Sequence, residues 1–261
     1  MTAIDYDQGL YRAYHAGRLM SEATGRLWME AVARHLPARA GLTILDLGAG
    51  TGRFSPLLAD AFDARVVAVE PSDMMRAAAA RHHPHPSVSY LAGAAERIPT
   101  RDAEFDVAFL SMVIHHVPNL AASVRELDRV VRPGGFVFVR NVFAGRLEGV
   151  PYFEFFPKAR ALDEARLPTV AAVRDAFLAA GFALVALEGV RQEIDPSLAA
   201  HYERIKRRAL STLALLSDAE FEAGLERMRG AVQAETRPLP VTEEIDLLVL
   251  RRAGARASAA P

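Results

Sequence analysis

The chain of 261 residues contains no cysteine. Disulfide bonds, thiolate nucleophiles and cysteine metal ligands are therefore excluded, and nothing indicates an oxidising compartment. No apolar run reaches the roughly 18 residues that a membrane-spanning helix needs. The N-terminus also lacks the basic and apolar segments of a secretion signal. We therefore expect a cytoplasmic protein with no membrane partner.

The chain also has no excess of charge of either sign. Its 31 basic and 32 acidic side chains give a formal net charge of −1. No strong field would attract nucleic acid, so we expect a small-molecule partner and no nucleic acid. A hydrophobic content of 51% is enough for one full core. We expect a single domain over residues 1–252, a disordered tail over 253–261, and we keep a homodimer open.

What the chain does have is a glycine-rich turn directly after an apolar run. Residues 44–53 read ILDLGAGTGR, so a buried strand enters a turn that carries Gly48, Gly50 and Gly52. Glycine permits positive φ and lets backbone N–H groups approach a ligand closely. In a dinucleotide turn the third glycine comes three residues after the second, where this chain has Arg53. The spacing therefore argues against the alternative of a nicotinamide oxidoreductase.

The following segments keep the order of an α/β nucleotide-binding fold. Residues 65–70 (RVVAVE) predict a second strand that ends in Glu70, whose carboxylate can accept hydrogen bonds from both hydroxyls of a ribose. Residues 87–92 predict a third strand, 104–117 a fourth strand with a histidine-bearing loop, and 129–139 a turn and a fifth strand. Alternating strands and helices predict a parallel sheet covered on both faces.

The ordered set of these five segments resembles the class I S-adenosylmethionine-dependent methyltransferases, of the small-molecule type found in ubiquinone and menaquinone biosynthesis. The resemblance covers roughly residues 40–140. It implies an α/β fold, Rossmann-like and doubly wound, with a mostly parallel seven-stranded sheet whose last strand is antiparallel. It also implies S-adenosyl-L-methionine as the cofactor, S-adenosyl-L-homocysteine as the product, and no metal.

The resemblance assigns cofactor contacts to individual residues. Glu70 matches the ribose-binding carboxylate, and Met74 matches a side chain that packs on the adenine. Ala94 stands where relatives often have an aspartate for the adenine amino group, which leaves that group to the backbone near Ala94 and Ala95. Arg18 is a candidate partner for the cofactor's carboxylate. The expected cofactor-binding residues are Asp46, Gly48, Ala49, Gly50, Gly52, Glu70, Pro71, Met74, Ala94, Ala95, Ser111 and Arg18.

Two adjacent histidines are the candidate catalytic residues. His115 and His116 follow the fourth strand, at the carboxyl edge of the sheet where ligands of open α/β sheets bind. Methyl transfer from a sulfonium mainly requires alignment and exclusion of water. Where the acceptor must lose a proton, one of these imidazoles is the expected general base. The alternative is that they pack against the next helix.

Three segments are expected to enclose a small, partly apolar methyl acceptor. Residues 1–38 resemble lid helices, and the loop after the fifth strand is rich in aromatic side chains. Residues 195–236 form a helical insertion between the sixth strand (182–190) and the seventh (244–252). The candidate acceptor-contacting residues are Tyr14, Phe143, Tyr152, Phe153 and Phe156, with packing against the sheet as the alternative role of the phenylalanines.

Helix start and stop signals mark the second half of the chain. Thr169 can cap a helix that Gly181 ends, and Ser217 with Glu220 forms a capping box. Asp195-Pro196 predicts the start of a helix that continues to residue 216, with the basic cluster at 204–208 on its solvated face.

The chemical step is left open by the sequence. The leading hypothesis is transfer of a methyl group to O, N or C of a small metabolite. The alternative is a fold that binds S-adenosylmethionine without methyl transfer, as a regulator, a cyclase or an isomerase, because a fold does not by itself settle function.

Overall fold

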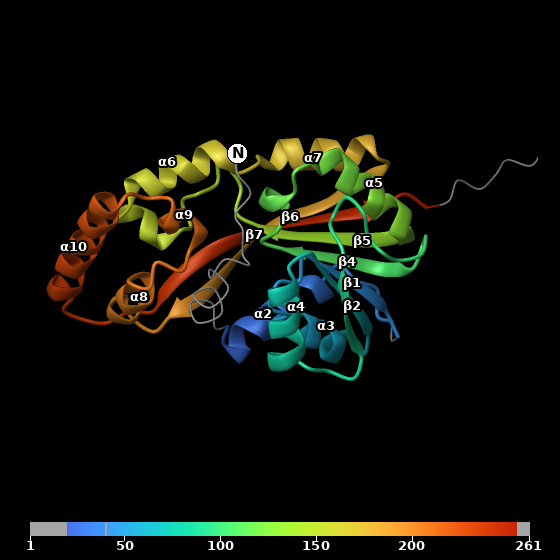
Figure 1. Cartoon of the computed structure of the whole chain (residues 1–261), viewed down its shortest axis with the longest axis horizontal. Helices are drawn as coiled ribbons and strands as arrows, with labels where there is room; N and C mark the ends of the chain where they lie inside the picture. Colours follow the sequence, from blue (N-terminus) through green and yellow to red (C-terminus); the bar gives the residue numbers. More distant parts are fainter. Residues whose placement is uncertain (1–19, 40, 255–261) are drawn as a thin grey trace, which may run out of the picture.

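The computed structural model describes residues 20–39 and 41–254, and its centre is a seven-stranded sheet (Figure 1). The strand order is β3-β2-β1-β4-β5-β7-β6. Strands β1 to β5 pair in parallel, whereas β7 is antiparallel to both β5 and β6. The expected fold class, including the antiparallel last strand, is confirmed. The strands are β1 Thr43–Leu47, β2 Arg65–Glu70, β3 Val88–Ala92, β4 Phe105–Ser111, β5 Val131–Asn141, β6 Phe182–Asp195 and β7 Val241–Arg252.

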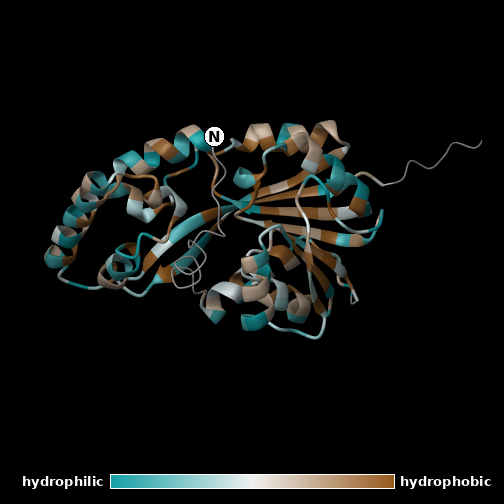
Figure 2. Cartoon of the chain, in the orientation of Figure 1, coloured by the Kyte–Doolittle hydropathy of each residue, from teal (hydrophilic) through white to brown (hydrophobic). Residues whose placement is uncertain are grey.

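Helices cover both faces of the sheet. Alternate side chains of each strand point to opposite faces, so Leu45 packs in one hydrophobic cluster with α5 and α7, and Ile44 packs in another with α2 and α3. Figure 2 shows the central strands as the most continuous hydrophobic part of the protein. The helices are α2 Glu22–Ala33, α3 Ser55–Phe62, α4 Asp73–His82, η2 Ile114–His116, α5 Leu120–Val130, η3 Pro151–Glu154, α6 Pro157–Arg166, α7 Val170–Ala179, α8 Leu198–Ile205, α9 Ser211–Ala214 and α10 Asp218–Ala234.

A long hairpin of β6 and β7 carries a second, helical lobe at one end of the sheet (Figure 1). Helices α8, α9 and α10 come from the expected insertion, but η3 and α6 come from the loop after β5. All five share a separate hydrophobic cluster. The hairpin is longer than the sequence predicted, because β6 continues to Asp195 and β7 begins at Val241. The added residues, 191–195 (RQEID) and 241–243 (VTE), are mostly polar or charged, so they carry no apolar period that marks a strand.

Most of the predicted helix ends are confirmed. Thr169 accepts a hydrogen bond from Ala172 N and caps α7, and Ser217 and Glu220 form the capping box of α10. The prediction of one helix from Asp195-Pro196 to residue 216 was wrong. The observed helix α8 has Ser197 as its N-cap and ends at Ile205, and Arg208, just beyond it, has a φ of +49°.

Two findings concern the described part of the chain as a whole. None of the helices within residues 20–39 and 41–254 is long and apolar enough to cross a membrane. Over the same ranges, no three His, Cys, Asp or Glu side chains gather closely enough to hold a metal ion.

Candidate functional site

The glycine turn connects β1 to α3 and is hydrogen-bonded to the end of β2. The N–H groups of Gly48 and Ala49 donate to the carbonyl oxygen of Val69, at 2.8 and 3.1 Å. The φ angles of Gly48, Gly50 and Gly52 are +71°, +57° and +78°. This left-handed region is costly for residues with a side chain. The turn therefore keeps its shape because all three positions are glycine.

The three glycines differ in what lies beside them. A Cβ atom on Gly48 would come within 2.2 Å of Val113 Cγ2, and one on Gly52 would come within 2.5 Å of Tyr90 Oη. A Cβ atom on Gly50 would have only Met75 Sδ nearby, at 3.7 Å. Gly48 and Gly52 are thus required by packing, whereas Gly50 borders open space that a ligand can fill.

Glu70 links this turn to the start of α4. Its carboxylate is 7% exposed and accepts hydrogen bonds from Gly50 N and Ser72 N, each at 3.0 Å. These two bonds hold the carboxylate between the glycine turn and the start of α4. The next residues in the chain are the exposed Pro71 and, in the first turn of α4, the half-buried Met74.

Asp46 lies beneath the turn. Its side chain is 2% exposed and accepts a 2.7 Å hydrogen bond from Ser55 Oγ, at the first residue of α3. Burial raises the pKa of Asp46 to about 7, with a contribution from the charge of Glu70; the Ser55 hydrogen bond and the charge of Arg53 act in the opposite direction. Asp46 therefore fixes the start of α3 beneath the glycine turn.

The other expected cofactor residues lie along the same edge of the sheet. Ala94 is exposed after β3, and its carbonyl oxygen accepts a hydrogen bond from Arg97 N at 3.1 Å. Ala95 is half-buried beside it. Ser111 ends β4 and bonds to Arg140 Nη1 at 3.3 Å. Arg18 lies outside the described residues.

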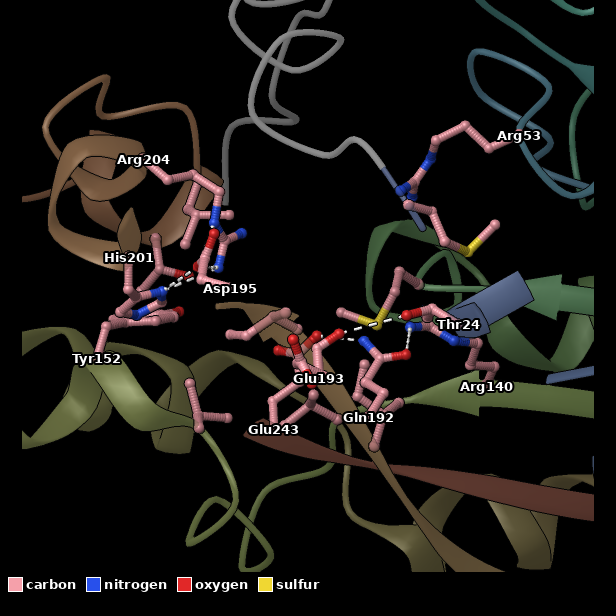
Figure 3. A pocket seen from close by; sticks show the side chains of 18 of the residues that line it. Thr24, Arg53, Arg140, Tyr152, Gln192, Glu193, Asp195, His201, Arg204 and Glu243 are labelled. Atoms are coloured by element: carbon pink, nitrogen blue, oxygen red, sulfur yellow. Dashed lines mark hydrogen bonds and ion pairs between the residues drawn. The ribbon is translucent and has the colours of Figure 1, made fainter. Parts of the chain in front are cut away.

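A cavity of about 870 Å³ lies between this edge and the helical lobe (Figure 3). Figure 3 shows Arg53, Thr24 and Arg140 on one side, and Tyr152 and the residues of α8 on the other. Gln192, Glu193 and Glu243 lie between the two sides. Apolar side chains complete the wall, among them Met20, Leu27, Phe54, Met112, Val142, Val150, Leu167, Ile194, Leu210 and Ile245.

The structure distinguishes the two candidate histidines. His115 lines the cavity, whereas His116, whose ring centroid is 4.1 Å from that of His115, is not part of the lining. His115 Nδ1 lies 3.0 Å from Asn141 Oδ1, and Asn141 Nδ2 donates to Val142 O. This assignment of the amide makes His115 Nδ1 the donor and puts the proton-accepting lone pair on Nε2. His115 is therefore the better candidate base.

Met112 shapes the loop that carries His115. It has a φ of +56°, and its N–H donates to Arg140 O at 2.8 Å. Non-glycine residues held at positive φ cost of order 1–3 kcal/mol and cluster at functional sites. The strained residue lines the cavity, which supports the placement of the site here.

Two cationic residues of the cavity were missed from the sequence. Arg140 is 5% exposed and follows the apolar residues 136–139 of β5, and a charge directly after such a run was a signal. Arg53 directly follows Gly52 and lines the cavity beside the turn. Among the described residues, Arg53 is therefore a candidate for the role expected of Arg18.

The aromatic candidates separate into two groups. Tyr152 lines the cavity. Phe143 is fully buried in the cluster beneath α5 and α7, and Phe153 and Phe156 are buried in the cluster of the helical lobe. These three phenylalanines have the contacts of packing residues. Tyr14 lies outside the described residues.

The helical lobe adds ion pairs that the sequence did not reveal. Asp163 Oδ1 binds Arg166 Nε at 2.6 Å, and both line the cavity. Arg204 had been expected on a solvated face, but it pairs with Asp195 at 2.8 Å and also lines the cavity. Asp163 and Arg166 stand three residues apart on α6, a spacing at which helical side chains meet. Only the packing of α6 and α8 brings both pairs to the cavity.

The sequence is similar to a methyltransferase family and to curated methyltransferases. Residues 45–139 match a family described as "Methyltransferase domain". A ubiquinone/menaquinone biosynthesis C-methyltransferase of Rubrivivax gelatinosus is 40% identical over 118 residues, 45% of this chain and 46% of the relative. A malonyl-acyl carrier protein O-methyltransferase of Serratia marcescens is 37% identical over 112 residues, 41% of each chain.

A solved structure is similar over a larger part of the chain. Phosphoethanolamine N-methyltransferase 2 of Haemonchus contortus, in complex with S-adenosyl-L-methionine, has a TM-score of 0.61 at 18% identity, over 97% of this chain and 60% of that chain. At this identity the likeness shows the fold. The sequence matches span less than half the length of the two curated relatives, and the family match ends at residue 139, before the helical lobe begins.

Proposed function

We propose that this chain, whose residues 45–139 form a class I methyltransferase domain, transfers a methyl group from S-adenosylmethionine to a small, partly apolar molecule. The observation that carries the proposal is the pairing of Gly50 with Glu70. Open space beside a positive-φ glycine lies next to a buried carboxylate that accepts a hydrogen bond from the N–H of the same glycine.

The residues at the edge of the sheet fit this cofactor. Glu70 would bind the ribose hydroxyls, and Met74 with the backbone of Ala94 and Ala95 would hold the adenine. Arg53 would bind the carboxylate of the amino-acid part, because a guanidinium binds carboxylates through paired hydrogen bonds. The bound cofactor supplies a methyl group on a sulfonium, which is a good leaving group.

The chain itself would align the acceptor and exclude water. Helix α2 and the helical lobe form the walls of the cavity, so the acceptor is held in one orientation toward the sheet edge. When the acceptor atom carries a proton, His115 would remove it through Nε2, with Asn141 keeping the imidazole in the required tautomer.

We make no choice among O, N and C as the atom that receives the methyl group. The two sequence relatives are a C- and an O-methyltransferase, and each is matched over less than half of its length. A cytoplasmic location and a homodimer also remain proposals.

The test is to incubate the protein with methyl-labelled S-adenosylmethionine and a panel of small acceptors. We expect label in a product and S-adenosylhomocysteine in equal amount. Glu70→Ala should weaken cofactor binding by about ten- to a hundredfold, because hydrogen bonds to charged groups contribute ~1.5–3 kcal/mol. Tight cofactor binding with no transfer to any acceptor would instead favour the regulator or cyclase hypothesis. Absence of cofactor binding would reject both.

A further inference from the structure

His201 lies in the helical lobe, on the cavity wall formed by α8. The residue is 0% exposed, and its Nδ1 lies 2.6 Å from Asp195 Oδ2. Burial by itself raises the pKa of Asp195, but the hydrogen bond from His201 and the charge and hydrogen bond of Arg204 together lower it. Asp195 is thus ionised at neutral pH and accepts a hydrogen bond from Nδ1 of His201. Arg204 Nη2 also lies 3.0 Å from this nitrogen, but it lies 2.8 Å from Asp195 Oδ2 and donates to that carboxylate oxygen.

The other ring nitrogen has no partner. With the proton on Nδ1, a neutral imidazole carries its accepting lone pair on Nε2. Within the part of the chain that the structure describes, His201 Nε2 is buried and makes no hydrogen bond. An unsatisfied buried polar atom costs roughly 1–3 kcal/mol, and most native buried groups have a partner. A donor on a molecule in the cavity would satisfy this nitrogen.

The surrounding charges indicate which kind of donor fits. The charge of Asp195 is balanced by Arg204, whose Nε and Nη2 lie 2.9 and 2.8 Å from the same carboxylate oxygen. On the neighbouring wall Asp163 is balanced by Arg166 at 2.6 Å. The helical side of the cavity therefore presents compensated ion pairs beside the Nε2 atom of His201. A neutral O–H or N–H group matches it better than an ion does.

We propose that His201 is an acceptor-binding residue, whose Nε2 accepts a hydrogen bond from a neutral hydroxyl or N–H group of the molecule in the cavity. Asp195 is the positioning residue that fixes the tautomer. The name "acceptor" rests on the proposed methyl transfer, but the hydrogen bond itself does not.

The test compares probes that differ only in the donor. Phenol and indole carry the O–H and N–H groups, and anisole and 1-methylindole are the matched molecules without them. Protein with ¹⁵N-labelled histidine is saturated with S-adenosylhomocysteine at pH 8, above the ordinary imidazole pKa. The His201 ring signals are identified by their loss in His201→Gln and by their shift in Asp195→Asn.

We expect phenol or indole to shift the Nε2 signal of His201, and the methylated probes to leave it unchanged. His35 is the internal control, since its Nε2 lies 2.7 Å from Glu188 and it is not part of the cavity lining. Binding of the donor probe should be about three- to tenfold weaker in His201→Phe, because one neutral hydrogen bond is lost. Anisole should bind both proteins equally, and His35→Gln should bind every probe as the native protein does.

The proposal is overturned if each donor probe and its methylated partner act alike on His201, if His201→Phe binds the donor probe as tightly as the native protein, or if neither phenol nor indole binds. In those cases His201 only ties α8 to the end of β6. If His201→Phe does not fold, the comparison of signals in the native protein still decides. No turnover is measured, so this result is independent of whether methyl transfer occurs.

Discussion

The guanidinium carbon of Arg140 lies 4.4 Å from the centroid of the Trp28 ring, beneath the cavity. The indole Nε1 of Trp28 donates to Gln192 Oε1, which also lies 3.4 Å from Arg140 Nη2. Trp28 is the only tryptophan in the chain. One residue of α2 thus holds a cation of β5 and an amide of β6 in place. The cavity floor depends on a contact between three distant segments.

Trp28→Phe should keep the ring beneath Arg140 but remove the donor to Gln192. Leaving a buried acceptor without its donor costs roughly 1–3 kcal/mol, and we expect this loss in the free energy of unfolding measured with urea. Gln192→Ala in the Trp28→Phe background should then cost less than in the native protein. Equal costs in both backgrounds would show that the hydrogen bond does not contribute.

Gly50→Ala should impair cofactor binding more than folding. The positive φ costs about 1–2 kcal/mol, but the new methyl group meets only Met75 at 3.7 Å. Calorimetric affinity for S-adenosylhomocysteine should fall by at least about tenfold, or ~1.4 kcal/mol. Gly48→Ala is the matched comparison, since its methyl group would collide with Val113 and should lower the melting temperature much further. Native affinity in Gly50→Ala would remove this glycine from the site.

His115→Ala should lower methyl transfer by about a hundredfold once an acceptor is known. Cofactor affinity should change little. His116→Ala should retain most of the turnover, because that residue is not part of the cavity lining. Near-native rates in His115→Ala would mean that alignment alone drives the reaction.

Gly224→Ala should loosen the helical lobe without affecting the cofactor site. A Cβ atom there would lie 2.1 Å from Phe156 Cε1, and overpacking of this kind costs ~1–3 kcal/mol. Gly230→Ala, in the same helix with nothing within 4 Å, should stabilise by roughly 0.5–1 kcal/mol. Thermal melts and acceptor turnover should separate the two variants, whereas their cofactor affinities should match.

The hydrophobic cluster of the helical lobe also means that α8 to α10 cannot be deleted without exposing the phenylalanines that they cover.

The buried carboxyl of Asp46 should make stability depend on pH. Its folded pKa of about 7 lies above the ordinary value of 3.8, so between these pH values the folded state binds more protons than the unfolded state. This contribution to stability is therefore lost as the pH rises from about 4 to about 7, by ~1.4 kcal/mol for each unit of pKa shift. Asp46→Asn should abolish that slope in urea titrations at several pH values. An identical slope in both proteins would contradict the assignment.

The sequence by itself determined the sheet and the cofactor turn, because both depend on local chemistry. Gly48, Gly50 and Gly52 are needed for positive φ, and Glu70 is placed by the end of an apolar strand. The capping box of Ser217 and Glu220 is likewise a local hydrogen-bond pattern, and it was predicted correctly. The order of the apolar strands was sufficient for the parallel sheet.

Only the tertiary structure decided which side chains line the cavity. The sequence could not choose between His115 and His116, because the choice depends on the bond to Asn141, 26 residues away. Phe153 and Phe156 had the composition of a pocket wall, yet α10 packs on them. The sequence did not point to His201 or Asp195 as cavity residues. Their interest comes from Nε2 of His201, which is buried without a hydrogen-bond partner once α8 packs on the end of β6. Local pattern fixes the elements, whereas burial and pairing across distant segments determine the site.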